Sequence, residues 1–88
     1  MNISVKPDPR AVNVEFDSEM LVVSLADGRR IQAPLEWFPP LRKATAKQRA
    51  KWRFIGDGVG IHWEDLDEDL SVEGLLVPER TFQRTKAA

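Results

Sequence analysis

The sequence contains no cysteine, and this absence removes two classes of small protein. Without cysteine, the chain has neither a disulfide framework nor a thiolate metal site. A domain of 88 residues that folds without such cross-links fits a reducing compartment. We therefore expect a cytoplasmic protein.

Long apolar segments are also missing. No apolar run approaches the roughly 18 residues that a membrane-spanning helix needs, and residues 1–10 hold no apolar stretch that would serve as a signal peptide. Hydrophobic residues make up 42% of the chain and charged residues 31%, which is ordinary for a globular protein. We expect one soluble domain over residues 11–77, with an extended lead-in over 1–10 and a polar tail over 78–88.

The first third of the domain predicts a three-stranded antiparallel meander over residues 11–16, 20–25 and 29–33. The first strand alternates apolar and polar residues with a period of two. The second is apolar on both faces, which is typical of a central strand. Asp27-Gly28 then indicates a two-residue type I′ hairpin turn. The side chains expected to face the core from the first strand are Val12, Val14 and Phe16.

Short helices are expected after the meander. A helical turn at residues 35–38 ends at Pro39-Pro40, because consecutive prolines cannot continue a helix. Thr45 and Gln48 fit a capping box, so a second helix begins there and runs to about residue 53. Three residues of this helix are expected to face the core: Ala46, Ala50 and Trp52.

One or two further short strands complete the predicted fold, which is of the α+β class. Phe54-Ile55 and Ile61–Trp63 flank a glycine loop at residues 56–60. The loop lacks the glycine that a dinucleotide fingerprint needs at its sixth position, where Ile61 stands, so we interpret it as a tight turn. Residues 71–76 fit a short strand or a helical turn equally well.

Charge is segregated along the chain, although the net charge is only −1. Six basic residues and no acidic one lie between residues 42 and 53, and six acidic residues and no basic one lie between 64 and 73. Such blocks either pair inside the fold or steer a charged partner. The sequence leaves both alternatives open.

Two features indicate a surface for a partner protein. Tryptophan and arginine dominate interface hot spots, and the Trp37–Leu41 segment holds large apolar side chains on a proline-stiffened backbone. The candidate partner-binding residues are Trp37, Phe38, Pro39, Leu41, Arg42, Lys47, Arg49 and Lys51. The candidate acidic surface comprises Asp65, Asp67, Glu68 and Asp69.

The acidic block has the alternating oxygen spacing of a calcium loop, but two positions fail. Leu70 stands where the sharp turn needs glycine, and Leu76 stands where the bidentate glutamate belongs. We therefore expect no metal site and no cofactor.

His62 is the chain's one histidine, and it lies near Asp65, Asp67 and Asp69 in sequence. Such a carboxylate would orient it as a general base. However, no serine or cysteine nucleophile context accompanies it, and no second histidine completes a zinc site. We therefore expect no catalytic residues.

Residues 11–77 resemble a family of bacterial proteins, the domain of unknown function family 2442. The resemblance is carried by Pro34-Leu-Glu-Trp37-Phe-Pro39, by His62-Trp63 followed by Leu66-Asp-Glu-Asp69, and by the Asp-Gly-Arg turn at 27–29. Two positions depart from the family pattern: Pro40 stands where a basic residue is common, and Glu64 where proline is common. The resemblance implies a small α+β domain without established catalytic residues. Family members are often encoded beside a second small protein, which implies an antitoxin-like or accessory role.

The expected function is therefore that of a small cytoplasmic binding or regulatory module, antitoxin-like and not an enzyme. Its partner is expected to be another protein, such as a co-encoded small protein. The alternatives are nucleic-acid binding through the basic helix at 45–53, phage-type inhibition of a host enzyme, and metal-dependent catalysis by His62 with nearby carboxylates. No known DNA-reading module accompanies the basic helix, so nucleic acid is not favoured.

Overall fold

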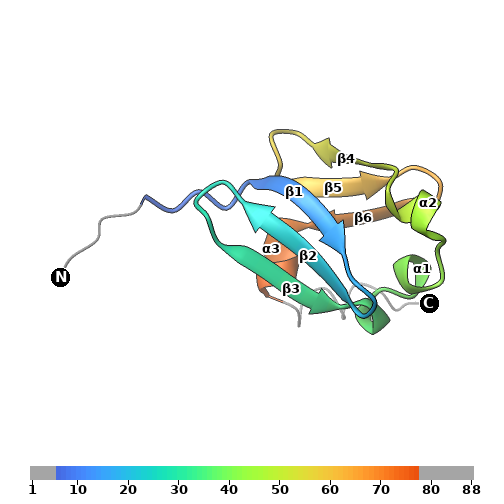
Figure 1. The fold of residues 1–88 in the computed structure, drawn as a ribbon. Helices are drawn as coiled ribbons and strands as arrows, with labels where there is room; N and C mark the ends of the chain where they lie inside the picture. Colours follow the sequence, from blue (N-terminus) through green and yellow to red (C-terminus); the bar gives the residue numbers. More distant parts are fainter. Residues whose placement is uncertain (1–5, 78–88) are drawn as a thin grey trace.

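The computed structural model describes residues 6–77, which form two three-stranded antiparallel sheets with short helices around them (Figure 1). The expected tail and the first half of the lead-in lie outside these residues. The α+β class is confirmed. The first sheet has the order β1-β2-β3 and the second β4-β5-β6. The strands are β1 (Ala11–Phe16), β2 (Met20–Leu25), β3 (Arg30–Pro34), β4 (Trp52–Ile55), β5 (Gly60–Trp63) and β6 (Glu68–Ser71).

Four short helical elements connect or flank the sheets. They are η1 (Leu35–Trp37), α1 (Pro39–Arg42), α2 (Ala46–Arg49) and α3 (Val72–Leu76). Between residues 6 and 77, no helix combines the length and the apolar character needed to cross a membrane. Figure 1 shows the first sheet in front of the second, with α1 and α2 at one end and α3 beside β3 and β6. The core lies between the two sheets.

The predicted meander is present, with β2 in its centre, but the first strand contains a bulge. Ala11 pairs with Leu25, and Asn13 pairs with the preceding residue of β2, so one extra residue is inserted in β1. As a result Ala11 and Val14 are buried, whereas Val12 is 54% exposed. The prediction that Val12 faces the core was wrong, because a bulge shifts the alternation by one residue.

The Asp27-Gly28 turn is present, but it is not the predicted type I′. Of the two residues only Gly28 has a positive φ, at 97°. The Gly28 N–H donates to the Leu25 carbonyl (3.0 Å), and the Leu25 N–H donates to the Arg29 carbonyl (2.8 Å). This pattern is a three-residue hairpin in which a glycine in the left-handed region follows the turn.

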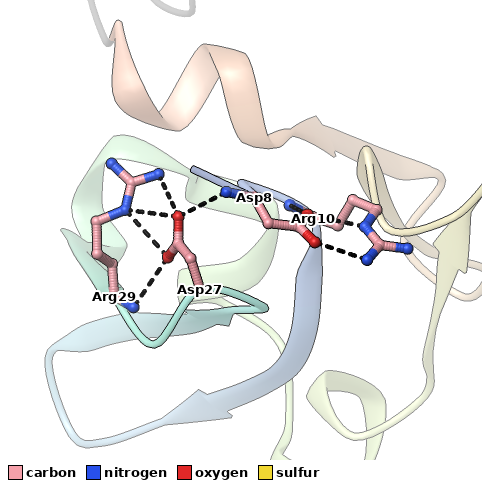
Figure 2. A network of polar contacts seen from close by, with 4 residues as sticks. All are labelled: Asp8, Arg10, Asp27 and Arg29. Carbon is pink, nitrogen blue, oxygen red and sulfur yellow. Dashed lines mark hydrogen bonds and ion pairs between the residues drawn. The ribbon is translucent and has the colours of Figure 1, made fainter. Parts of the chain in front are cut away.

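The Asp27 carboxylate fastens the lead-in to this hairpin (Figure 2). It accepts the Asp8 N–H at 2.9 Å and pairs with the Arg29 guanidinium at 2.9 Å, and its side chain is only 3% exposed. Asp8 in turn binds the Arg10 guanidinium through two hydrogen bonds, of 2.8 and 2.7 Å. The hydrogen bond with Arg29 is the largest of the effects that hold the pKa of Asp27 well below its usual range.

The connector between the sheets differs from the single helix expected after Thr45. Pro39-Pro40 ends η1 as predicted, but it also begins α1, because proline is tolerated in the first turn of a helix. The capping box is confirmed: the Thr45 N–H donates to Gln48 Oε1 at 3.0 Å and the Gln48 N–H donates to Thr45 Oγ1 at 3.1 Å.

This second helix, α2, ends at Arg49 rather than near residue 53. Trp52 already belongs to β4, where it pairs with Trp63. A helix as short as the one predicted over residues 45–53 contributes little stability by itself. The pairing of β4 with β5 therefore prevails from Trp52 onward. Ala46 and Ala50 are exposed, and the prediction that they face the core was wrong.

The second sheet is formed around the predicted glycine loop. Gly56 and Gly58 both have positive φ, which supports its interpretation as a tight turn. For residues 71–76 the sequence fits a strand or a helical turn, and the structure contains the end of a strand followed by a helix. Ser71 ends β6, and its hydroxyl accepts the Gly74 N–H at 2.8 Å, capping α3.

The first testable prediction concerns Gly58, where the two sheets meet. The Ala11 N–H donates to the Gly58 carbonyl at 2.7 Å, and a Cβ on Gly58 would lie 2.5 Å from the Ala11 oxygen. Gly28 has nearly the same φ, but a Cβ there meets no described atom within 4 Å. Gly28→Ala should cost about 1–2 kcal/mol of unfolding free energy, and Gly58→Ala about 3 kcal/mol or more. Urea unfolding measures both, and equal losses would contradict the close approach of the sheets.

A second prediction follows from the depressed pKa of Asp27. A carboxylate of this kind stabilises the fold above its unfolded pKa, and the contribution is lost as the pH falls through the folded pKa. Asp27→Asn should lower the unfolding free energy at neutral pH, and the difference from the wild type should shrink below pH 3.8, the ordinary value. Urea unfolding across this range measures the difference. Glu36→Gln, which removes an exposed carboxylate elsewhere, should change little, and a pH-independent effect of Asp27→Asn would contradict the assignment.

Candidate functional site

The expected partner-binding segment divides into core and surface. Phe38 is 3% exposed and Leu41 0%, so the prediction that they contact a partner was wrong. The turns η1 and α1 direct both side chains into the core, where their apolar surface is removed from water. Trp37 is half-buried and lies edge-on to Phe38, at 6.3 Å between ring centroids, whereas Pro39 is exposed.

The side chain of Arg49 is partly buried and is held by contacts within the molecule. Its Nε donates to the Leu41 carbonyl at 2.9 Å and its Nη2 donates to the Arg42 carbonyl at 3.0 Å. Its guanidinium lies over the Phe16 ring, 5.4 Å from the centroid. The side chain thus satisfies the last carbonyls of α1 and packs against the first sheet. Arg49 thus has a structural role in the connector, and its assignment as a partner-binding residue stays a prediction.

Three exposed cations remain on the connector: Arg42, Lys43 and Lys47, which we call the basic connector surface. None of them forms an ion pair with another residue of the 6–77 segment. Apart from Lys6 and the internal Arg49, the other described cations pair with carboxylates. These pairs are Arg10–Asp8, Arg29–Asp27, Arg30–Glu15, Lys51–Asp65 and Arg53–Glu64.

The acidic block pairs with only part of the basic one. Lys51 Nζ lies 3.4 Å from the Asp65 carboxylate, and Arg53 Nε lies 3.8 Å from that of Glu64. Figure 1 places the β5–β6 turn, which carries these carboxylates, next to α2. Both pairs are well exposed, so they contribute little to stability. Their effect is to neutralise Lys51, which leaves the positive charge concentrated at the basic connector surface.

The acidic candidates do not converge on one point. Asp65 contacts Lys51, Asp67 occupies the turn with a φ of 50°, and Asp69 contacts His62. Glu68 is half-buried. Across residues 6–77, no three histidine or carboxylate side chains are grouped so as to hold a metal ion.

His62 lies on the outer face of the second sheet, in a cross-strand row with Arg53 and Asp69. Its Nδ1 hydrogen-bonds the Asp69 carboxylate, its Nε2 lies 3.3 Å from the Glu64 carboxylate, and its side chain is 16% exposed. The hydrogen bond to Asp69 is the main cause that raises the pKa of His62 above 6.5; partial burial and Arg53 oppose it. With a carboxylate at each nitrogen, the ring favours the charged imidazolium, which links β5 to β6. A general base needs a free nitrogen facing its substrate, whereas both ring nitrogens of His62 face carboxylates.

The pKa of His62 is the subject of the third prediction. Asp69→Asn should lower this pKa toward 6.5, its ordinary value, because the main stabilising contact of the imidazolium is lost. As the sequence has one histidine, its imidazole proton signals in an NMR pH titration are unambiguous. Asp67→Asn is the matched control, since Asp67 lies in the turn, outside this row, and should leave the titration unchanged.

The same interaction sets a pH dependence of stability. A group whose pKa is raised on folding stabilises the fold below its unfolded pKa, and this contribution is lost as the pH rises through the folded pKa. The difference in unfolding free energy between the wild type and His62→Gln should therefore be largest below pH 6.5 and decrease at higher pH. A difference that grows with pH would contradict the assignment.

One feature of the site, the exposed Lys43, was not predicted from the sequence, and another, the His62–Asp69 contact, was only one of three alternatives for His62. Lys43 was counted in the basic run but not among the candidate residues, and no local signal distinguishes its exposure. The His62–Asp69 contact joins residues that face each other across the β5–β6 hairpin. Predicting β6 and its register would have found this pair, because residues directly opposite each other in a sheet are in contact.

Comparison with known proteins identifies relatives of this fold. A crystal structure of a protein of unknown function from Rhodospirillum rubrum is 34% identical, with a TM-score of 0.68, over 78% of this chain and 86% of that one. The solution NMR structure of an uncharacterised protein from Chromobacterium violaceum is 27% identical, also with a TM-score of 0.68, over 81% of this chain and 67% of that one. A search of curated proteins finds no match.

The family model described as "Protein of unknown function (DUF2442)" matches residues 11–81. This range includes both sheets and the connector between them. The chain therefore belongs to the DUF2442 family, as the resemblance in its sequence indicates.

Proposed function

We propose that this protein is a small binding module that contacts an acidic segment of another protein through the basic connector surface. One observation carries the proposal: the unpaired positive charge of the described chain gathers at Arg42, Lys43 and Lys47. Elsewhere, basic side chains other than Lys6 pair with acidic residues or with backbone carbonyls. Opposite charge on the partner would speed encounter and set its orientation.

The neighbourhood of this surface favours a protein over a nucleic acid. The acidic turn that holds Glu64 and Asp65 lies beside α2, and Asp67 adds a further negative charge there. A polyanion extending beyond the three cations would be repelled by these carboxylates. The net charge of −1 provides no compensating attraction. A partner that presents a short acidic segment avoids this repulsion.

Trp37, Pro39 and Pro40 give the surface an apolar border. The two prolines are exposed, and Trp37 is half-buried at the end of η1. Proline-stiffened segments lose little conformational freedom on binding, which favours affinity. A tryptophan at such a border is a typical hot-spot residue. The partner segment is therefore acidic with an apolar side chain next to its charges.

This role is regulatory rather than catalytic. We place the protein in the cytoplasm because a cysteine-free domain of this size fits a reducing compartment. The first partner to test is a small protein encoded beside it, as the family resemblance suggests, which would make the role antitoxin-like. Inhibition of a host enzyme by the same surface is the rival within this proposal.

The fourth prediction tests this surface by cross-linking and affinity capture from native lysate. The variant R42Q/K43Q/K47Q removes the basic connector surface. Its matched control, K6Q/R30Q/R53Q, removes the same charge from other parts of the described chain. We expect the wild type and the control to retain the same partner, and the connector variant to bind it at least about tenfold more weakly at about 0.15 M salt.

Two outcomes would contradict the proposal. If all three proteins retain the same set of proteins, the basic connector surface is not a binding site. If wild-type binding is instead to single-stranded DNA or heparin at that salt, and is lost in the connector variant, the surface binds nucleic acid.

A further inference from the structure

The outer edge of β1 is open to a further strand. β1 lies at the margin of the first sheet, so β2 pairs with it on one side only (Figure 1). In an antiparallel pair, residues that exchange hydrogen bonds with the facing strand alternate with residues whose backbone groups point away from it. The Asp17 N–H donates to the Met20 carbonyl at 3.0 Å, which assigns Asp17 and Glu15 to the first kind. The N–H and C=O groups of Val14 and Phe16 therefore point away from β2.

These outward groups have no partner in the described part of the chain. Within residues 6–77, no hydrogen bond engages the N–H or C=O of Val14 or Phe16. Val14 is nevertheless only 6% exposed, and Phe16 is half-buried. Backbone polar groups of buried residues are nearly always paired. A further strand would supply the donors and acceptors that this edge lacks.

A hollow lies along the same edge. It measures about 600 Å³ and is lined by residues 14–18 on one side and by Ala46 and Arg49 on the other. The Arg49 guanidinium lies 5.4 Å from the centroid of the Phe16 ring, which places α2 at the end of β1. A row of alternating backbone donors and acceptors beside such a hollow matches an extended peptide backbone.

Positive charge gathers at the α2 end of this hollow. Lys47 belongs to the basic connector surface and forms no ion pair within residues 6–77. Arg49 donates to two carbonyls but pairs with no carboxylate of those residues, so its charge is not neutralised. The carboxylates on the β1 side are engaged: Glu15 forms an ion pair at 3.1 Å, and Asp17 accepts two backbone N–H groups. The charges therefore favour a strand that is acidic at its α2 end.

We propose that the acidic segment of the partner binds as an extended strand that adds to the outer edge of β1. This inference rests on the proposed function, since the same segment contacts the basic connector surface. The backbone of the segment exchanges hydrogen bonds with Val14 and Phe16, which extends the first sheet by one strand. These main-chain bonds supply affinity, and the alternate side chains that pack beside Val14 and Phe16 supply specificity.

The charges also set the direction of the added strand. Antiparallel pairing is the more stable arrangement, and β1 ends beside α2. An antiparallel strand therefore begins beside α2, so its acidic residues come first, next to Lys47 and Arg49. Apolar residues follow at alternate positions, on the face of the sheet that Val14 and Phe16 occupy. The partner segment is thus acidic at its amino end and alternately apolar after it.

Amide hydrogen exchange measured by NMR, with a synthetic peptide as the probe, is the test and the fifth prediction. The probe is acetyl-Asp-Glu-Asp-Val-Thr-Val-Thr-amide, whose two valines lie opposite Phe16 and Val14 in the proposed register. Peptide at about 2 mM should slow exchange of the Val14 and Phe16 amides at least about fivefold, because each amide then donates to the added strand. The amide of Phe54, in the edge strand β4, is the internal control and should keep its rate.

Two matched comparisons test the direction and the charge. The reversed peptide, acetyl-Thr-Val-Thr-Val-Asp-Glu-Asp-amide, has the same composition but can place its acidic residues beside α2 only by the less stable parallel pairing. It should bind at least about threefold more weakly, and Lys47→Gln should weaken binding of the first peptide by about the same factor. Lys6→Gln, which removes an exposed charge outside the hollow, should leave binding unchanged.

Peptide binding that leaves the Val14 and Phe16 amides unprotected would overturn the inference, and so would the absence of binding at the highest concentration. The same holds if these two amides already exchange as slowly as that of Glu15 in the free protein. Failure here is distinguishable from failure of the proposed function. If R42Q/K43Q/K47Q loses the lysate partner but the peptide protects neither amide, the connector binds a partner that adds no strand to β1. If capture is independent of the connector, the proposed function itself fails.

Discussion

The fold depends on the burial of one indole ring. Trp63 is fully buried between the sheets, and its Nε1–H donates to the Arg49 carbonyl at 3.0 Å. Phe16 meets its ring edge-on, at 6.2 Å between centroids, so the last residue of β1 and the last residue of β5 pack together. A buried indole requires an acceptor for its N–H. The end of α2 supplies it, which ties the second sheet to the connector.

This arrangement determines which cations remain available to a partner. The backbone carbonyl of Arg49 accepts the Trp63 indole N–H, and the Arg49 side chain lies over Phe16 and donates to the last carbonyls of α1. Phe38 and Leu41 are held in the core by the same short turns. The connector therefore faces water with Arg42, Lys43 and Lys47. The same short turns that bury Phe38 and Leu41 therefore also leave these three basic side chains exposed.

The sequence predicts those features that depend on neighbours in the chain. The apolar β2, the Thr45 capping box and the glycine loop are local, and all three were predicted. The bulge at Val12 was not, because it accompanies the contact between Ala11 and Gly58 of the other sheet. Similarly, α2 ends early because Trp52 pairs with Trp63. At the site, the exposure of Lys47 was predicted, whereas the contacts of the Arg49 side chain depend on carbonyls seven and eight residues away and were not.

Charge segregation in the sequence has a different meaning in the folded chain. The acidic block neutralises Lys51 and Arg53 locally and places two carboxylates beside His62, so half of its six carboxylates contact basic residues in or next to its own sheet. None of the three connector cations forms an ion pair with these carboxylates. Consequently a chain of nearly zero net charge retains a directional positive surface. That direction would be lost in a protein whose opposite charges alternated along the chain, because each would be neutralised by its neighbours.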